Sequence, residues 1–173
     1  MLNASVGVSS LPLPKLKVDR REKPLTLVKT IRTIVGENNT ELATLPCADY
    51  AVGTVVGIER KKIGNLLSSM TTRMASGDIE LWDQLARCVN HYDNTYLIVE
   101  GDLDPVANPK MSIADGRSRG VGYLAVQATI EKVQMQGIRV LQTRSEIGTA
   151  LVLKWLWKRY APMVQAQERA AVL

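Results

Sequence analysis

The chain has 173 residues, of which 46% are hydrophobic and 23% are charged, with a formal net charge of +5 and a sequence pI near 9.3. These values are typical of one soluble globular domain, and they favour a polyanionic partner without proving one. One histidine, His91, and two isolated cysteines, Cys47 and Cys88, are too few for a tetrahedral zinc site, a histidine-based catalytic triad or a disulfide framework.

The predicted elements alternate between strands and helices. A flexible arm over residues 1–15 is followed, in chain order, by a strand over 16–19, a helix over 24–36, strands over 40–53 and 54–60, helices over 62–76 and 78–92, a strand over 95–101, a polar loop over 102–118, a helix over 122–136, a strand over 138–143 and a helix over 145–161. Asp78 and Ser145 are the expected N-caps of the helices that follow them, and Pro162 is expected to stop the last helix. The alternation predicts an α/β fold with a mixed central sheet flanked by helices, in one domain over residues 16–162 with a tail over 163–173.

Acidic side chains occur close to the ends of three predicted strands. They are Asp19 and Glu22 in VDRRE, Asp49 in CADY, and Glu59, followed by Lys61, in IERK. Glu59 and Lys61 are two residues apart, so both point to the same face of a regular strand. Taken singly, each acid also fits an ordinary surface turn, and a bare E-x-K occurs by chance. The three stretches together favour a site where strand ends converge.

A histidine-free group of carboxylates with a lysine suits the metal-assisted hydrolysis of a phosphodiester. Mg²⁺ prefers oxygen ligands in octahedral geometry and keeps several waters, so one or two carboxylates are enough to hold it. Such a metal lowers the pKa of a bound water and neutralises charge on a phosphoryl transition state. We therefore expect Mg²⁺ as the cofactor, with Mn²⁺ able to substitute.

Three motifs resemble those of a known family. VDRRE (residues 18–22), LPCADY (45–50) and GIERKKIGN (57–65), the last followed by LLSSMTTRM, are similar to the V-D-x-R-E, G-D and E-R-K-x-x-x-D motifs in the nuclease domain of the XPF/Mus family of structure-specific endonucleases. The resemblance covers roughly residues 16 to 160. It implies a restriction-endonuclease-like core of the PD-(D/E)xK type. It also implies a metal-dependent DNA endonuclease that hydrolyses phosphodiester bonds in branched, forked, flap or junction DNA, during recombination, repair or phage DNA processing.

The resemblance also implies roles for individual residues. Asp49 and Glu59 would ligate the metal through their side chains, with Asp19 completing the acidic cluster and the Arg60 carbonyl as a further ligand. Lys61 would orient or help to activate the attacking water and stabilise charge on the phosphate. Arg21 and Glu22 would complete the first motif near the scissile phosphate. The implied catalytic residues are Asp19, Glu22, Asp49, Glu59, Arg60 and Lys61.

Two positions depart from the family motifs. Ala48 replaces the glycine of the G-D pair, so a backbone conformation or close approach that needs glycine would have to be preserved. Asn65 replaces the last acid of E-R-K-x-x-x-D. Asn and Asp serve about equally well if this position caps the following helix, whereas activity would be weakened if a charge here tunes the metal shell. Because the core acids and the lysine are intact, we expect an active enzyme.

Basic residues near these motifs are expected to contact DNA phosphates, which position a duplex but read little sequence. They are Arg20, Arg21, Lys62, Lys110, Arg117 and Arg119. The last three belong to the polar loop, which also fits a plain solvated basic loop. The last helix is apolar around its whole circumference, with Trp155 and Trp157 on different faces. Since family nuclease domains pair, we expect a homodimer.

Other interpretations stay open. The fold could belong to a catalytically silent DNA-binding scaffold subunit, or the acids could be incidental in an unrelated α/β domain that binds a small molecule. The chain has no glycine-rich phosphate loop such as G-x-x-x-x-G-K, so no nucleotide cofactor is expected. No apolar run reaches the ~18 residues of a membrane span, and the first residues lack the features of a signal peptide. We expect an intracellular protein of the cytoplasm or nucleoid, in a bacterial or phage-infected cell, that is neither secreted nor membrane-bound.

Overall fold

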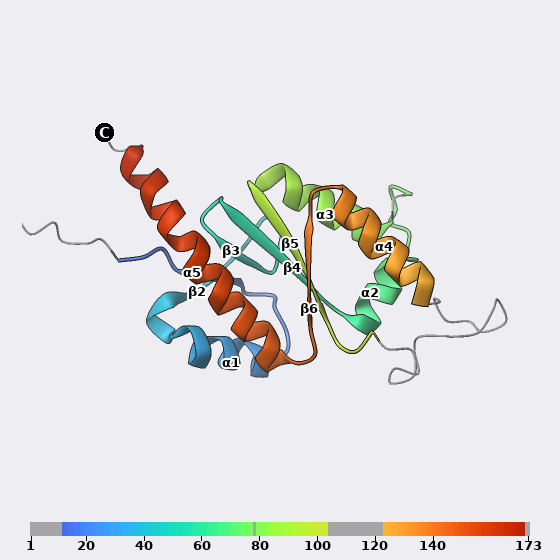
Figure 1. Cartoon of the computed structure of the whole chain (residues 1–173), viewed down its shortest axis with the longest axis horizontal. Helices are drawn as coiled ribbons and strands as arrows, with labels where there is room; N and C mark the ends of the chain where they lie inside the picture. The colour runs from blue at the N-terminus through green and yellow to red at the C-terminus, as the bar shows by residue number, and fades with distance from the viewer. Residues whose placement is uncertain (1–11, 78, 104–122, 172–173) are drawn as a thin grey trace, which may run out of the picture.

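The computed structural model describes residues 12–77, 79–103 and 123–171, and it confirms the expected α/β fold with a mixed sheet (Figure 1). The strands are β1 Leu16–Asp19, β2 Thr40–Ala43, β3 Tyr50–Val52, β4 Val56–Lys62, β5 Asn94–Glu100 and β6 Arg139–Thr143. The helices are α1 Leu25–Val35, the short 3₁₀ helix η1 Glu37–Asn39, α2 Ile63–Ser69, α3 Glu80–His91, α4 Tyr123–Met135 and α5 Glu146–Ala170.

The strands form a six-stranded sheet in the order β2-β1-β3-β4-β5-β6. Strand β3 runs antiparallel to both of its neighbours, and the other pairs are parallel. In the parallel register of β4 and β5, Glu59 lies beside Leu97 and Lys62 lies beside Glu100. Most of β5 is a continuous apolar run because both faces of this central strand are buried.

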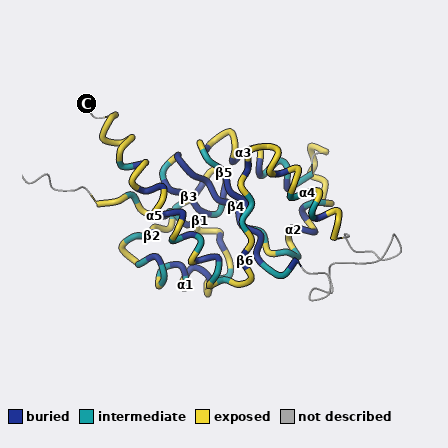
Figure 2. Tube along the Cα trace, viewed as in Figure 1, coloured by how far each residue is buried: buried dark blue, intermediate teal, exposed yellow. Residues whose placement is uncertain are grey.

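Helices cover both faces of the sheet (Figure 1). Helices α1 and α5 pack on one face, where Ile31 and Leu153 belong to one apolar cluster with the strands. Helices α2, α3 and α4 cover the other face, where Leu66, Leu85 and Val126 belong to a second cluster. Figure 2 shows that the strands are largely buried, whereas the far end of α5 is exposed. No helix in the described part of the chain is long and apolar enough to cross a membrane.

Residues 40–53 form two strands rather than the single predicted one. Strand β2 lies at the edge of the sheet beside β1, whereas β3 lies on the other side of β1 and pairs with β4. The segment between them contains Pro46, which lacks the N–H that a β-ladder needs, and Ala48, whose φ of 75° turns the chain. The predicted junction at Gly53 is confirmed as the turn between β3 and β4, where Gly53 has a φ of 56°.

Helix α2 is shorter than predicted, because it ends at Ser69 rather than near residue 76. Thr71 and Thr72 follow it, and each hydroxyl donates to the Ser68 carbonyl at 3.0 Å. Such local bonds between a side chain and the backbone offer the chain an alternative to another helical turn. The chain from Met70 to Gly77 therefore leads toward α3 without a further helical turn.

Helix α5 runs through Pro162 instead of stopping there, so that part of the prediction was wrong. A proline inside a helix removes one backbone hydrogen bond, but Val164 beyond it is buried and packs against the turn at Gly53. This contact holds the last turns of the helix against the sheet. The predicted N-cap Ser145 is confirmed, since its Oγ accepts a hydrogen bond at 3.2 Å from the N–H three residues on. The other predicted cap, Asp78, lies outside the described residues.

Candidate active site

Three neighbouring strands bring Asp19, Asp49 and Glu59 to one region of the sheet. Asp19 ends β1 as predicted, but Asp49 precedes β3 and Glu59 lies inside β4, so the expected strand-end positions were wrong for these two. They meet because β3 is antiparallel to both neighbours, which places its start beside the end of β1 and the second half of β4. The Asp19 N–H donates to the Asp49 carbonyl at 2.8 Å, and the Asp49 N–H donates to the Ile58 carbonyl at 3.0 Å.

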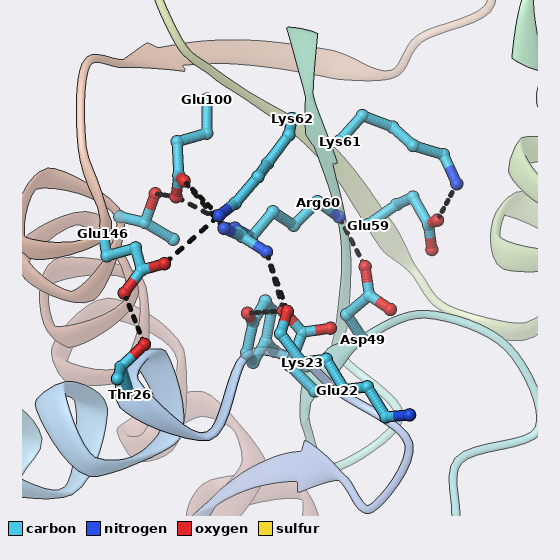
Figure 3. A network of polar contacts seen from close by, with 12 residues as sticks. Glu22, Lys23, Thr26, Asp49, Glu59, Arg60, Lys61, Lys62, Glu100 and Glu146 are labelled. Atoms are coloured by element: carbon cyan, nitrogen blue, oxygen red, sulfur yellow. Dashed lines mark hydrogen bonds and ion pairs between the residues drawn. The ribbon is translucent and has the colours of Figure 1, made fainter. Parts of the chain in front are cut away.

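Glu59 and Lys61 point to the same face of β4, as their spacing predicts. Lys61 Nζ lies 2.9 Å from Glu59 Oε1, and the two side chains are only 12% and 8% exposed. Arg60 lies between them and points to the opposite face, while its backbone N–H donates to Asp49 Oδ2 at 2.7 Å. Figure 3 shows the Asp49 and Glu59 carboxylates on the same side of the strand as the Lys61 amine, with the Arg60 guanidinium on the other side.

The surroundings of Asp49 disfavour its negative charge. Burial raises the pKa of this carboxyl well above its usual value, and the charges of Glu59 and Glu22 raise it further. The Arg60 N–H and the Lys61 ammonium act in the opposite direction but do not offset these effects. A divalent cation beside Asp49 and Glu59 would relieve the repulsion, and carboxylate oxygens are the ligands that Mg²⁺ prefers. These two side chains therefore fit the implied metal.

Asp19 is engaged in a different way. Arg21 Nε and Nη2 donate to its two oxygens at 2.8 and 2.9 Å, and the backbone N–H groups of Arg21 and Leu45 donate at 2.8 Å each. The Arg21 side chain is the main cause that lowers the pKa of Asp19 to about 2, although burial opposes it. Asp19 thereby anchors the loop that leads from Leu45 to Asp49. Among the described residues, no three His, Cys, Asp or Glu side chains gather closely enough to hold a metal.

The Arg60 guanidinium is the centre of a buried ion network (Figure 3). It donates to the two oxygens of Glu100 at 2.7 and 2.9 Å and to Glu22 Oε1 at 3.0 Å. Tyr50 donates to Glu22 at 2.8 Å, and Thr149 donates to Glu100 at 2.6 Å. The charged side chains are all less than a tenth exposed. Burial nevertheless holds the pKa of Glu22 above its ordinary value. The network ties β4 to β5 and to α5.

Two cavities share Asp49 and Glu59 in their walls. One, of about 230 Å³, is also lined by Asp19 and Arg21. The other, of about 440 Å³, has a wall that is rich in polar and charged side chains: Glu22, Arg60, Lys61, Lys62 and Asn65. All six residues that the sequence singled out as catalytic therefore line one cavity or both.

Helix α3 supplies two wall residues that the sequence did not single out. Gln84 lines both cavities, and Arg87 lines the smaller one while pairing with Asp83 at 3.1 Å. Gln84 and Arg87 are three residues apart and so share one face of the helix. That spacing is visible in the sequence, but it has a meaning only once α3 is known to lie beside β4.

The residues expected to contact DNA are described in part. Arg20 is exposed, the Arg21 side chain is 72% exposed, and the Lys62 side chain is 45% exposed although it lies 3.2 Å from Glu146. Arg21 borders the smaller cavity and Lys62 the larger one. Three expected contacts lie outside the described residues: Lys110, Arg117 and Arg119.

The two departures from the family motifs both border the site. Ala48 has a φ of 75°, in the left-handed region that favours glycine, so alanine here adopts a conformation suited to glycine. Asn65 is the third residue of α2, whose N-cap is Lys62 without a capping side-chain bond, so the capping interpretation of Asn65 is wrong. Asn65 instead lines the larger cavity, where a charge would act on the site.

Comparisons with known proteins identify the family of the chain. The model of the ERCC4 domain matches residues 18–156. The 3′-flap repair endonuclease Xpf of Saccharolobus solfataricus is 27% identical over 116 residues, which are 67% of this chain and 43% of that protein. The chain thus spans less than half the length of this curated relative.

Solved structures agree in fold. XPF from Aeropyrum pernix has a TM-score of 0.61 at 24% identity, over 90% of this chain and 69% of the other. XPF from Aeropyrum pernix in complex with DNA has a TM-score of 0.59 at 26% identity, over 84% and 64%. The match of the family model over most of the chain, together with the three motifs around the paired carboxylates, shows that the chain belongs to the ERCC4-domain family of XPF-type nucleases.

Proposed function

We propose that the protein is a divalent-metal-dependent endodeoxyribonuclease that hydrolyses phosphodiester bonds in branched DNA. The observation that carries the proposal is the arrangement of Asp49, Glu59 and Lys61: two buried carboxylates that repel each other, with an ammonium group 2.9 Å from one of them. The curated relative is named as a 3′-flap repair endonuclease, and one solved relative is a complex with DNA. These names support DNA as the substrate, and forks, flaps or junctions as its form.

The carboxylates and the lysine would have different roles, the first in metal binding and the second in contacts to the water or the phosphate. Asp49 and Glu59 would hold Mg²⁺ or Mn²⁺, with the Arg60 carbonyl as a further ligand, and such an ion would supply a water of lowered pKa and a positive charge for the phosphate. Lys61, whose Nζ lies 2.9 Å from Glu59 Oε1, would donate a hydrogen bond to the attacking water or to a phosphate oxygen. Because burial and the neighbouring acids raise the pKa of Asp49, metal binding at this carboxyl would strengthen as the pH rises.

Three side chains would stabilise this site through their hydrogen bonds: Asp19, Glu22 and Arg60. Asp19 fixes the loop before Asp49 through its bonds to Arg21 and the Leu45 N–H. Glu22 and Arg60 hold β4 through the buried network. Their part in catalysis is to keep the paired carboxylates in place.

Basic residues beside the two cavities would hold the DNA backbone. Arg20 and Arg21 follow β1 and Lys62 ends β4, so they approach the paired carboxylates from different strands. Three residues outside the described part of the chain remain predicted DNA contacts: Lys110, Arg117 and Arg119. Loss of one phosphate contact reduces the slope of the logarithm of the DNA-binding constant against the logarithm of salt concentration by about one unit. Fluorescence anisotropy at several salt concentrations measures this slope.

A homodimer is part of the proposal. Helix α5 exposes Ile147, Leu151 and Trp155, which lie four residues apart in one stripe and are 61%, 54% and 50% exposed. Trp157 is mostly buried and has a partner in the same chain, because its Nε1 donates a hydrogen bond to the Pro14 carbonyl at 2.8 Å. The exposed stripe is the surface that a second copy would cover. Light scattering at micromolar concentration should report a dimer, and a monomer would contradict this part of the proposal.

A catalytically silent DNA-binding scaffold is the second candidate. Two observations favour it: Asn65 is neutral where the family motif has an acid, and both oxygens of Asp19 are engaged by Arg21 and Leu45. Two acidic side chains, Asp49 and Glu59, then remain for the ion. Cleavage by the wild-type protein distinguishes the two candidates, and increased cleavage in Asn65→Asp would show that the neutral residue weakens the site.

The deciding experiment uses end-labelled linear duplex, single strand, fork, flap and four-way junction. Each is incubated with the purified protein in Mg²⁺, in Mn²⁺ and in chelator, beside Asp49→Asn, Glu59→Gln and the exposed control Glu41→Gln. Metal-dependent cuts near the branch that vanish in the two site variants and persist in the control would establish the nuclease. Binding without cleavage, unchanged by the site variants, would leave the scaffold.

A further inference from the structure

Gln84 lies where the two cavities meet. Among the described residues, three line both cavities: Asp49, Glu59 and Gln84. Glu59 belongs to β4 and Asp49 directly precedes β3, whereas Gln84 comes from helix α3. Leu81 and Leu85 on that helix are fully buried in the apolar cluster beneath the sheet, so they fix the part of the helix that presents Gln84. The position of Gln84 is therefore set by packing rather than by a flexible loop.

The two ends of the Gln84 amide have different partners. Nε2 donates to Glu80 Oε1 at 3.4 Å, one helical turn earlier. Oε1 is buried, and in the described part of the chain it has no hydrogen-bond partner. Because the Glu80 carboxylate only accepts, it selects the NH₂ side of the amide and leaves the oxygen without a partner. A buried acceptor without a donor is destabilising, so such an atom in a native structure calls for a partner.

Only a hydrogen-bond donor or a cation can be the partner of the Gln84 oxygen. An amide oxygen only accepts hydrogen bonds, so it cannot bind the phosphate oxygens of DNA or an ionised carboxylate such as those that would hold a metal. It can bind a hard cation or a water molecule that such a cation retains, and Mg²⁺ keeps several waters when one or two carboxylates hold it. We propose that Gln84 is a positioning residue whose Oε1 accepts a hydrogen bond from a water held on a divalent ion beside Asp49 and Glu59. The assignment rests on the proposed function.

Partners of this kind typically change metal affinity or activity by about 10–100-fold when they are removed. Gln84→Met keeps the length of the side chain and removes the acceptor, whereas Gln84→Glu keeps an acceptor oxygen. Gln134→Met, at an exposed position on α4, is the matched control. Isothermal titration calorimetry with Mn²⁺ alone, without DNA, measures the affinity in each protein. Single-turnover cleavage in saturating Mn²⁺ measures the rate.

We expect Gln84→Met to lower the Mn²⁺ affinity or the single-turnover rate by at least about tenfold, and Gln84→Glu and the control to retain both. The Tm of metal-free Gln84→Met should equal or exceed that of the wild type, because the variant lacks a buried acceptor without a partner. A structural role would instead lower the Tm. Unchanged affinity and rate in Gln84→Met would overturn the assignment, as would a lowered Tm with a parallel loss of binding.

The same data separate this assignment from the proposed function. If the wild type binds Mn²⁺ but cuts no DNA, the nuclease proposal fails, and the Mn²⁺ affinity of Gln84→Met alone decides the role of Gln84. If the wild type cuts DNA and Gln84→Met binds and cuts equally well, the nuclease stands and the assignment of Gln84 fails. If the wild type binds no Mn²⁺, the assignment is overturned.

Discussion

Arg60→Met would leave two buried carboxylates, Glu22 and Glu100, without the cation that they share. The Arg60 side chain is 4% exposed and donates three hydrogen bonds to them, at 2.7, 2.9 and 3.0 Å. Removal of one partner from a buried ion pair costs about 3–5 kcal/mol, which is a large part of the total stability of a domain. We therefore expect the free energy of unfolding to fall by about 3–5 kcal/mol at pH 8.

This loss should shrink as the pH falls. Burial raises the pKa of Glu100, and the bonds and charge of Arg60, with the bond from Thr149, bring it below its ordinary value. In Arg60→Met, burial would place the pKa of both Glu22 and Glu100 above the unfolded-state value, so the folded state would bind more protons than the unfolded state. The stability lost at high pH then returns as the pH falls through the raised pKa values. In the wild type, the lowered pKa of Glu100 instead contributes stability that is lost as the pH falls.

Urea unfolding followed by far-UV circular dichroism at pH 8 and pH 5.5 measures both effects. Arg144→Met, at an exposed arginine, is the control and should change stability by no more than about 0.5 kcal/mol. The triple variant with Glu22→Gln and Glu100→Gln should recover much of the loss, because the uncompensated charges are gone. A loss below about 1 kcal/mol at pH 8, or one that does not depend on pH, would refute the reasoning.

Three further substitutions test the site and its backbone. Asp49→Asn should stabilise the metal-free protein by about 1 kcal/mol at pH 7.5, because burial and Glu59 raise the pKa of this carboxyl and disfavour its charge. The variant should also abolish Mn²⁺ binding. Lower stability in urea unfolding would contradict the first expectation. Ala48→Gly should raise stability by about 0.5 kcal/mol. Glycine removes ~1–2 kcal/mol of strain at this left-handed position of the folded chain, whereas its greater freedom in the unfolded chain costs ~0.4–1 kcal/mol. Thermal melting measures whether stability rises or falls. Gly57→Ala should destabilise by about 1–3 kcal/mol, because the added Cβ would overlap the Tyr92 ring. Tyr92→Leu in the same chain should restore part of that loss, and a Gly57→Ala protein with wild-type stability would show that the ring moves aside freely.

Features that depend on neighbouring residues could be predicted from the sequence. The helical spacing in α1, the N-cap at Ser145 and the alternation of strands and helices follow from local geometry, and the structure confirms them. The spacing of Glu59 and Lys61 likewise placed both side chains on one face of β4. The motifs around these residues were sufficient to predict the family, because each motif is a short continuous stretch of chain.

The tertiary structure decided which side chains meet. Asp49 faces Glu59 because β3 runs antiparallel between β1 and β4. Pro46 is a local sign of a break in residues 40–53, but only the sheet places the two resulting strands on opposite sides of β1. Gln84 reaches the same cavities only because α3 packs beside β4.

Packing between distant parts of the chain also determined the pKa values of the acids and the point at which helix α5 ends. Arg60 meets Glu100 from forty residues away, and Val164 packs at Gly53 to hold α5 beyond Pro162. The pKa values of the acids follow from the same packing, since the cost of a charge depends on the water that its neighbours exclude and not on the residues beside it in the chain.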